Sequence, residues 1–200
     1  VDINHEKQAF EELTLDHAAE HTRAFIKVQD GCNQFCSYCI IPYARGRVRS
    51  RNVQNVLEEV KRLAASGYQE VVHQVEGIRR IRLGSLEPRI VTETFAEELA
   101  KMEKICPHFH LSLQSGCDAT LARMNRKYTT EEYENACSIL RKNFTHPAIT
   151  TDVIVGFPGE TEEEFAQTKE YLKRIHFYEM HIFKYSRRQG TRAAVMEHQV

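Results

Sequence analysis

The sequence lacks several features that mark specialised classes of protein. Its 200 residues hold no apolar run near the ~18 residues that a membrane-spanning helix requires. No basic segment followed by an apolar stretch opens the chain, so we expect no secretory signal. Neither charge dominates, since 27 basic side chains face 28 acidic ones, which argues against a purely electrostatic nucleic-acid binder. The 42% of hydrophobic residues exclude a disordered chain.

Cysteine is also scarce, and its placement is more informative than its number. Six cysteines are too few for a disulfide-stapled scaffold of this length. Three of them lie within eight positions and three are scattered, namely Cys32, Cys36 and Cys39 against Cys106, Cys117 and Cys137. Three crowded thiols cannot all pair locally, so metal ligation is the better interpretation and a reducing, cytoplasmic location is expected.

We expect an acidic arm at residues 1–22 and one domain at residues 23–200, a length that suits a single core. The arm carries six carboxylates and one lysine. Because the chain opens on Val1 rather than methionine, we expect it to be a piece of a longer protein.

Hydrophobic periodicity predicts that strands and helices alternate along the domain. Alternating residues predict a strand at 24–29, and an i, i+3, i+4 pattern predicts a helix at 53–64 closed by Gly67. Capping boxes begin helices at Thr129 and Thr161. The other expected elements are strands at 70–72, 81–84, 108–113, 150–155 and 179–183, and helical stretches at 92–104 and before 123. This alternation predicts an α/β fold with a parallel sheet, either a partial barrel or a doubly wound sheet.

One connection is too short for this fold. A parallel crossover requires roughly a dozen residues, usually with a helix, but only eight separate Val72 from Ile81. We therefore expect a segment to be missing between Val72 and His73.

The segment with the clearest chemistry is the C-x3-C-x2-C loop at 32–39, which directly follows the first expected strand. Three thiolates on one loop can hold three irons of a [4Fe–4S] cluster and leave the fourth open to a chelating ligand. The alternative is a zinc site completed by a histidine such as His21. Zinc sites more often use paired C-x2-C knuckles, and the sequence has no second pair, which favours the cluster.

This loop resembles the cluster loop of the radical S-adenosylmethionine superfamily, including an aromatic residue, Tyr38, before the third cysteine. Other stretches resemble the methylthiotransferases of that superfamily: IIPYARGRVRSR (40–51), RLGSLEP (82–88), LQSG (113–116), RMNRKY (123–128), DVIVGFPGE (152–160) and YSRRQGT (185–191). The resemblance covers about residues 23–195. The stretches IIPYARG and RIRLGSLEP are most similar to the branch that acts on threonylcarbamoyladenosine in tRNA.

The resemblance implies a six-stranded partial (β/α)6 barrel of TIM type. It also implies a [4Fe–4S] cluster held by Cys32, Cys36 and Cys39 that reduces S-adenosylmethionine. The resulting 5′-deoxyadenosyl radical would abstract hydrogen from C2 of adenine, which then receives a methylthio group. The implied partners are tRNA and an electron donor of flavodoxin or ferredoxin type, with no membrane. The family also has an N-terminal domain with a second cluster and a C-terminal RNA-binding domain, neither of which this sequence contains.

The resemblance further assigns residues to cofactor binding: Tyr38, Ser85, Gln114, Ser115, Arg126, Asp152, Ile154 and Gly156. Arg126 would bind the methionine carboxylate by its fork of donors, and a surface salt bridge is its alternative. Ser115 is equally well explained as a helix cap, and Glu87 as a charge at a helix start. Asp152 stands where the superfamily often has glycine.

Four arginines follow the loop, namely Arg45, Arg47, Arg49 and Arg51. On an extended segment they would point to one side and bind phosphates near a flipped-out adenosine. The alternative is an arm that packs on carboxylates of the domain. We interpret Cys106, Cys117 and Cys137 as small buried hydrophobes.

The primary hypothesis is thus the radical domain of a tRNA methylthiotransferase. Alternatives are a relative that acts on isopentenyl-adenosine in tRNA or on a ribosomal-protein aspartate, and a non-catalytic, zinc-bound RNA-binding module.

Overall fold

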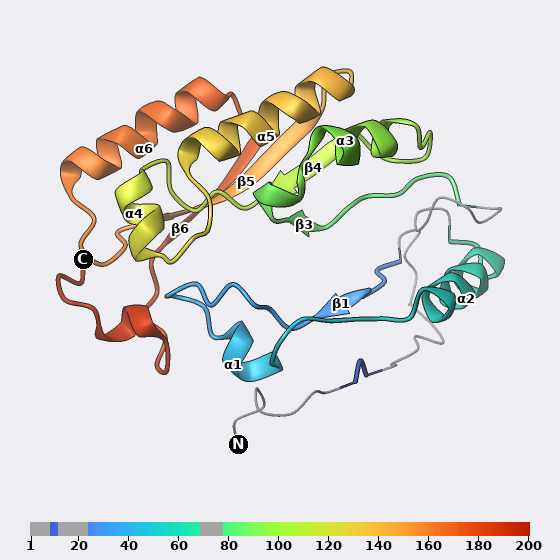
Figure 1. Cartoon of the computed structure of the whole chain (residues 1–200), viewed down its shortest axis with the longest axis horizontal. Coiled ribbons are helices and arrows are strands. Elements are labelled where there is room, and N and C mark those ends of the chain that lie inside the picture. Colours follow the sequence, from blue (N-terminus) through green and yellow to red (C-terminus); the bar gives the residue numbers. More distant parts are fainter. Residues whose placement is uncertain (1–8, 12–23, 69–77) are drawn as a thin grey trace. The chain divides into compact units, whose positions relative to one another are not determined.

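The computed structural model describes residues 9–11, 24–68 and 78–200 (Figure 1). The chain divides into two compact units. The first contains residues up to 33, 41–82 and 102–106, and the second contains 34–40, 83–101 and 107–200. In the described part of the chain, no helix is long and apolar enough to cross a membrane.

The second unit contains a sheet of four parallel strands in the order β3-β4-β5-β6. Helices lie between successive strands, as the α/β class requires, so the predicted class is confirmed. The strands are β3 (Ser85–Leu86), β4 (His108–Leu111), β5 (Ala148–Val155) and β6 (Glu179–Lys184). The helices are η1 (Pro88–Ile90), α3 (Glu93–Ala100), α4 (Asp118–Arg123), α5 (Thr130–Asn143), α6 (Glu162–Ile175) and η2 (Arg192–Val195).

Both predicted capping boxes form. The Thr129 hydroxyl accepts from the Glu132 amide, and the Glu132 carboxylate accepts from the Thr129 amide at the start of α5. Thr161 and Glu164 do the same for α6. Each box satisfies two backbone donors that a helix start leaves open, which is why these boundaries were readable in the sequence.

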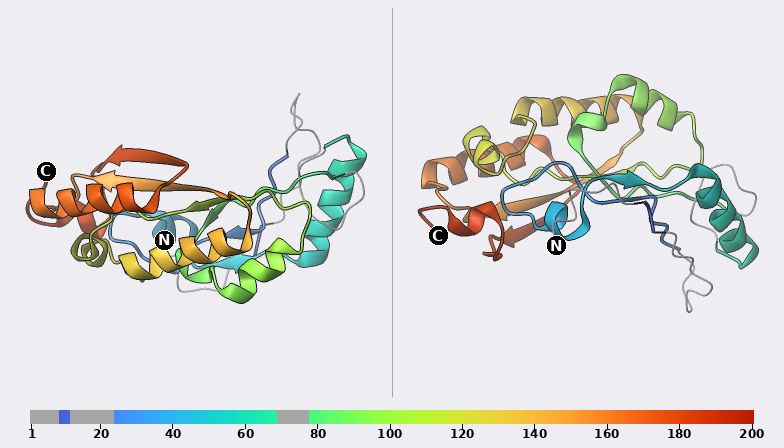
Figure 2. Two further views of the ribbon diagram at one scale, coloured as in Figure 1. Left: turned by 90° about the horizontal axis from the view of Figure 1, so that it is seen from above. Right: turned by 60° about the horizontal axis from the view of Figure 1, so that its bottom comes forward.

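The core of the second unit lies between the sheet and α5 and α6, which run along one face of it (Figures 1 and 2). Side chains alternate between the two faces of a strand, and Phe109, Leu111, Ile149 and Val153 are all buried on the helix-covered face. Tyr133 of α5 donates from its hydroxyl to the Leu111 carbonyl at 2.8 Å. The helices therefore fix the position of the strand ends, where the candidate site lies.

The first unit is smaller and contains an antiparallel pair, β1 (Gln29–Asp30) with β2 (Arg49–Ser50). Its helices are α1 (Ile41–Arg45) and α2 (Val53–Ala65). The apolar face of α2 packs Val60 against Ile78 and Ile81, as the periodicity predicts. Gly67 follows the helix with φ of 91°, a left-handed conformation that favours glycine.

Several expected elements differ from the structure. Of the residues expected to form a strand at 24–29, only Gln29 does, and the observed strand β1 is Gln29–Asp30. The helix expected at 92–104 ends at Ala100. Ile81 forms an isolated bridge with Ile105, and the strand itself lies at Ser85–Leu86. The strand expected at 70–72 and the missing segment after Val72 lie outside the described residues, as does most of the arm at 1–22. The segment and the arm stay predictions.

The arginine stretch also differs from the prediction of one extended segment. Helix α1 ends at Arg45, and Arg49 belongs to β2, where it donates to Asp30 at 2.9 Å. Arg51 is buried against the equally buried Glu59 of α2. For Arg49 and Arg51 the alternative of packing on carboxylates is therefore the better description, because both are held within the first unit.

The Arg51–Glu59 pair leads to a prediction on stability. Because each side chain is only 4% exposed, removing one leaves a buried charge without its partner. Glu59→Ala is expected to lower the free energy of unfolding by about 3–5 kcal/mol, measured by urea denaturation. Glu170→Ala, which breaks an exposed pair with Lys173, should leave the free energy of unfolding nearly unchanged. Equal effects of the two variants would contradict a specific role for the buried pair.

Candidate functional site

The cysteine loop joins the two units. None of the three cysteines forms a disulfide; Cys36 is buried and Cys39 half-buried in the second unit, whereas Cys32 belongs to the first. The Cys39 amide donates to the Cys36 carbonyl at 3.0 Å, which closes a tight turn between them. The second unit thus brings together two of the three predicted ligands.

The turn is fixed by the end of α4. Ser37 donates from its amide to the Met124 carbonyl at 2.9 Å and from its hydroxyl to the Arg123 carbonyl at 2.9 Å. Asn125, in a left-handed conformation with φ of 58°, donates to the Phe35 carbonyl at 2.8 Å. The stretch RMNRKY therefore includes residues that hold the cysteine loop in place, a role the sequence did not indicate.

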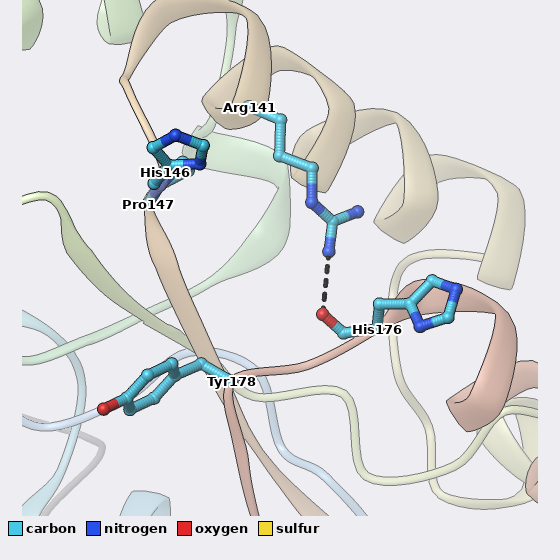
Figure 3. A pocket seen from close by; sticks show the side chains of 5 residues that line it. All are labelled: Arg141, His146, Pro147, His176 and Tyr178. Carbon is cyan, nitrogen blue, oxygen red and sulfur yellow. Dashed lines mark hydrogen bonds between the residues drawn. The ribbon is translucent and has the colours of Figure 1, made fainter.

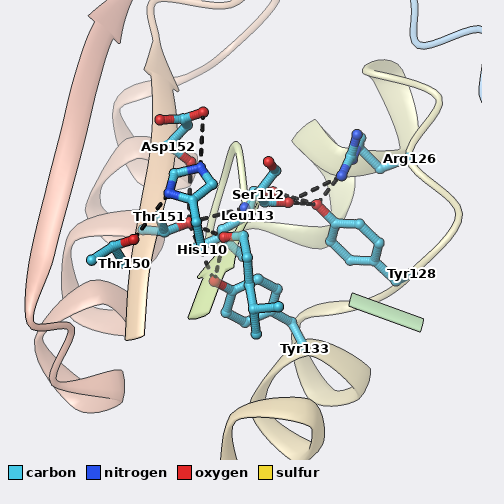
Figure 4. Close-up of polar contacts among 10 residues, drawn as sticks. His110, Ser112, Leu113, Arg126, Tyr128, Tyr133, Thr150, Thr151 and Asp152 are labelled. Atoms are coloured by element: carbon cyan, nitrogen blue, oxygen red, sulfur yellow. Dashed lines mark hydrogen bonds and ion pairs between the residues drawn. The ribbon is translucent and has the colours of Figure 1, made fainter. Parts of the chain in front are cut away.

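Arg126 lies against the loop but does not present a free fork. Its guanidinium donates to the Cys36 Sγ at 3.3 Å and to the Ser112 carbonyl at 3.0 Å, and its Nε donates to the Tyr128 hydroxyl at 2.9 Å. Figure 4 shows the contacts with Ser112 and Tyr128. The alternative of a surface salt bridge is wrong, since these partners are protein sulfur and oxygen in the interior. The guanidinium thus lies within hydrogen-bonding distance of the Cys36 sulfur.

A pocket of about 310 Å³ opens beside the turn, and we call it the Tyr38 pocket. It is lined by Tyr38, Cys39, Gln114, Asp152, Ile154, Phe183, Lys184, Tyr185, Ser186 and Arg188. Five of these, counting Cys39, belong to the predicted site. The others come from the carboxyl end of β6 and the segment that follows it, in agreement with the rule that α/β ligands bind at the carboxyl ends of the strands.

Gln114 and Ile154 face the pocket because their backbones are paired. The Gln114 amide donates to the Asp152 carbonyl, and the Ile154 amide donates to the Gln114 carbonyl, both at 2.8 Å. Gln114 has φ of 74°, an uncommon conformation for a residue other than glycine. Such local strain is often found at binding sites.

The remaining predicted residues lie elsewhere. Ser115 is fully buried, accepts from the Cys117 amide at 3.2 Å and contacts Thr168 of α6. It does not line the Tyr38 pocket, and it is not a helix cap either, because the N-cap of α4 is Cys117. Ser85 is exposed on β3 and does not line the Tyr38 pocket. Glu87 caps η1 by accepting from the Arg89 amide at 3.1 Å, as its alternative proposed.

Gly156 forms the turn after β5 with φ of 69°. The Glu160 carboxylate accepts from the amides of Gly156 at 2.6 Å and Phe157 at 3.3 Å. Burial raises the pKa of Glu160 above its ordinary value. The glutamate of DVIVGFPGE thus shapes the turn that follows the pocket-lining end of β5.

Sequence reasoning missed the pocket residues on and after β6 as a group, although it quoted the stretch YSRRQGT. The Tyr185 hydroxyl is buried without a hydrogen-bond partner among the described residues, and burial raises the pKa of Tyr185. His110, which contacts Asp152, was not singled out either. The alternation of side chains along β4 places His110 on the same face as His108. Its contact with Asp152 of β5 could not be predicted, because it depends on the register between the two strands.

A second hollow, of about 490 Å³, lies at the other end of β5 and β6 (Figure 3). It is lined by Arg141, His146, Pro147, His176 and Tyr178. Arg141 donates to the carbonyls of Ile175 and His176, the latter at 3.1 Å. These are the open acceptors at the end of α6, so the arginine acts as a helix cap.

Comparison with known proteins places the chain in a family. The model of the radical SAM superfamily matches residues 26–84 and 74–172. The chain is 41% identical, over 96% of its length, to the threonylcarbamoyladenosine tRNA methylthiotransferase MtaB of Bacillus subtilis, and covers 49% of that protein. It is 39% identical, over 98% of its length, to the tRNA-2-methylthio-N(6)-dimethylallyladenosine synthase of Clostridium novyi, again covering 49%.

The fold agrees with this result. The radical S-adenosylmethionine methyltransferase TsrM of Kitasatospora setae superposes with a TM-score of 0.69 at 18% identity, over 84% of this chain and 38% of that one. The expected partial barrel of radical SAM type is thereby confirmed as the fold, although the described residues of the second unit hold a parallel sheet of four strands rather than the six that the resemblance implies. The chain spans about half the length of the curated relatives it matches. Because the superfamily model matches most of its length, the chain belongs to the radical SAM superfamily, and it is similar to tRNA methylthiotransferases over nearly its whole length.

Proposed function

We propose that this chain is the radical domain of an enzyme that adds a methylthio group to C2 of N6-threonylcarbamoyladenosine in the anticodon loop of tRNA. The observation that carries the proposal is the C-x3-C-x2-C loop at the Tyr38 pocket of a chain similar to tRNA methylthiotransferases over nearly its whole length. The stretches IIPYARG and RIRLGSLEP support the threonylcarbamoyl branch. Dimethylallyladenosine, the substrate in the name of the Clostridium novyi relative, is the alternative.

The residues present fit an iron–sulfur cluster with an open iron. Cys36 and Cys39 lie on one turn and form no disulfide. Cys32 is four residues before Cys36, so the chain keeps their Cα atoms within about 14 Å of each other. Arg126 donates a hydrogen bond to the Cys36 sulfur, and hydrogen bonds to the sulfurs are among the features that tune iron–sulfur clusters. We propose Cys32, Cys36 and Cys39 as the three ligands.

The residues of the Tyr38 pocket also fit S-adenosylmethionine. The unpartnered Tyr185 hydroxyl and the Gln114 amide supply polar groups, and Tyr38, Ile154 and Phe183 supply apolar surface for a purine. When bound, the cluster and S-adenosylmethionine would supply the radical that removes hydrogen from adenine. The protein would hold the reacting groups in place and exclude water from them.

The proposed partners are tRNA and an electron donor of flavodoxin or ferredoxin type, and the proposed location is the cytoplasm. A purified, anaerobically reconstituted protein should be brown, absorb near ~400 nm and contain iron. It should form 5′-deoxyadenosine from S-adenosylmethionine when reduced. A colourless protein with stoichiometric zinc would instead support the RNA-binding module.

Arg45 and Arg47 are exposed, although the Arg45 guanidinium also lies 3.8 Å from the Asp30 carboxylate, and these two are the arginines that we propose to contact tRNA phosphates. Arg47→Glu and Arg45→Glu are each expected to weaken tRNA binding and to reduce the slope of log K against log salt by about 1, because each phosphate contact releases counterions. Fluorescence anisotropy over a salt series would measure both quantities. The control is Lys61→Glu, on exposed α2, which should leave the slope unchanged. An unchanged slope for both arginine variants would favour the arm that packs on carboxylates.

A further inference from the structure

A histidine of β4 contacts two side chains of the neighbouring strand β5 (Figure 4). Nδ1 of His110 lies 3.0 Å from the Thr150 hydroxyl, and Nε2 lies 3.3 Å from the Asp152 carboxylate. Thr150 is the register partner of His110, and Asp152 is two residues further along β5, so the three side chains share one face of the sheet. Both ring nitrogens are engaged, which fixes the orientation of the imidazole.

The two contacts also determine which nitrogen of a neutral His110 carries the proton. A carboxylate has no proton to donate, so Nε2 must donate to Asp152. The Nδ1 atom then accepts from the buried hydroxyl of Thr150, which is able to donate. Thr150 thus sets the tautomer of the ring, and the ring directs its N–H at the carboxylate.

Asp152 connects these three side chains to the Tyr38 pocket. It lines the pocket, and 30% of its side chain is exposed, whereas His110 does not line the pocket and is only 15% exposed. The histidine contacts the Oδ2 atom of Asp152, and within the described ranges of the chain no residue donates to the Oδ1 atom. The carboxylate is therefore held through one oxygen and keeps an acceptor for a ligand.

We propose that His110 is a positioning residue, which holds the Asp152 carboxylate in the orientation in which it accepts a hydrogen bond from S-adenosylmethionine in the Tyr38 pocket. The inference rests on the proposed function, which assigns this cofactor to the pocket. S-adenosylmethionine carries hydroxyl and amino groups that donate to carboxylates. A hydrogen bond to a charged acceptor is strong, and an acceptor that is already oriented costs less conformational entropy when the ligand binds.

The test is a double-mutant cycle on the Kd of S-adenosylmethionine. The Kd is measured by isothermal titration calorimetry on the reconstituted chain without a reductant, so that no turnover occurs. His110→Phe keeps a ring but removes both hydrogen bonds, and it is expected to raise the Kd about tenfold. Asp152→Asn should raise the Kd at least as much. In the Asp152→Asn background, His110→Phe should change the Kd by less than about twofold, because a residue that acts through Asp152 then has no carboxylate to position.

A matched pair of variants separates positioning from packing. The amide of His110→Gln is long enough to donate to Asp152, whereas that of His110→Asn is one methylene shorter and extends only toward Thr150. We expect His110→Gln to keep the Kd within about twofold of wild type, and His110→Asn to raise it about as much as His110→Phe does. This pair decides the question if His110→Phe does not fold. Thermal unfolding and iron content are measured for each variant.

The outcomes are distinguishable. A Kd that His110→Phe leaves unchanged, or raises equally with and without the Asp152 carboxylate, would overturn the inference and leave the proposed function standing. Equal losses of affinity in His110→Gln and His110→Asn would assign the histidine to packing between the strands and overturn it as well. If the wild-type chain, loaded with iron, did not bind S-adenosylmethionine, the proposed function itself would be contradicted.

Discussion

Replacing Cys32, Cys36 or Cys39 singly by alanine is expected to abolish iron loading and the cleavage of S-adenosylmethionine. A cluster with one open iron is held by only three thiolates, so the loss of any one of them leaves too few ligands to hold it. Iron and sulfide content, absorbance near ~400 nm and chromatographic assay of 5′-deoxyadenosine would measure the loss. We expect no product above the background of the iron-free protein.

The other cysteines provide matched controls. Cys106→Ala, Cys117→Ala and Cys137→Ala should retain iron, because none of these cysteines belongs to the loop. Because Cys137 is buried, its replacement by alanine should lower the free energy of unfolding by about 1 kcal/mol. Cys36→Ser separates ligation from packing, since a hydroxyl still accepts from Arg126 but is a poor ligand for iron. If any single loop variant still cleaved S-adenosylmethionine after reconstitution, the assignment of the three ligands would be wrong.

The second large effect is the absence of a product. This 200-residue chain, reconstituted and reduced, is expected to form 5′-deoxyadenosine slowly and to make no methylthiolated tRNA. In the family that the chain resembles, the sulfur comes from a second cluster, which needs three further thiolates close together. Cys106 belongs to the first unit, and Cys117 and Cys137 are buried in the second. Burial raises the pKa of Cys137 to about 12, which keeps its thiol protonated at neutral pH.

Mass spectrometry of nucleosides from digested tRNA would test this expectation. The digest should contain no adenosine that has gained a methylthio group, while the same reaction mixture contains 5′-deoxyadenosine. The matching positive control is a full-length member of the family under the same conditions. A methylthiolated adenosine formed by this chain alone would show that its remaining cysteines do supply sulfur.

Local sequence was sufficient for the elements whose boundaries depend on neighbouring residues. The capping boxes at Thr129 and Thr161 use side chains three positions away, so α5 and α6 begin where expected. The periodicity of 53–64 gives α2 in the same way. The short strands are less predictable, because a strand such as β3 exists only where its partner β4 lies beside it.

The features of the candidate site can be divided in the same way, into those that the sequence predicted and those that only the tertiary structure placed. The sequence by itself determined the cysteine loop, since metal ligands at close spacing need no tertiary information. It also placed Gln114 directly after one expected strand, and Asp152 and Ile154 within another. The sequence could not distinguish a buried ion pair from an RNA contact. Arg51 has the same spacing as the other arginines of its stretch, and only the packing of α2 brings Glu59 against it. The same holds for Ser115, which α6 covers through Thr168.

Only the tertiary structure decided which side chains meet across the sheet. His110 and Asp152 are far apart in the sequence and become neighbours because the register of β4 against β5 pairs His110 with Thr150. His181 joins them through the register of β6. Register depends on how helices and strands pack over the whole unit, so a shift by one residue would turn these polar side chains to the helix-covered face. The sequence therefore determined the chemistry of the loop, and the packing of the sheet decided what surrounds the pocket beside it.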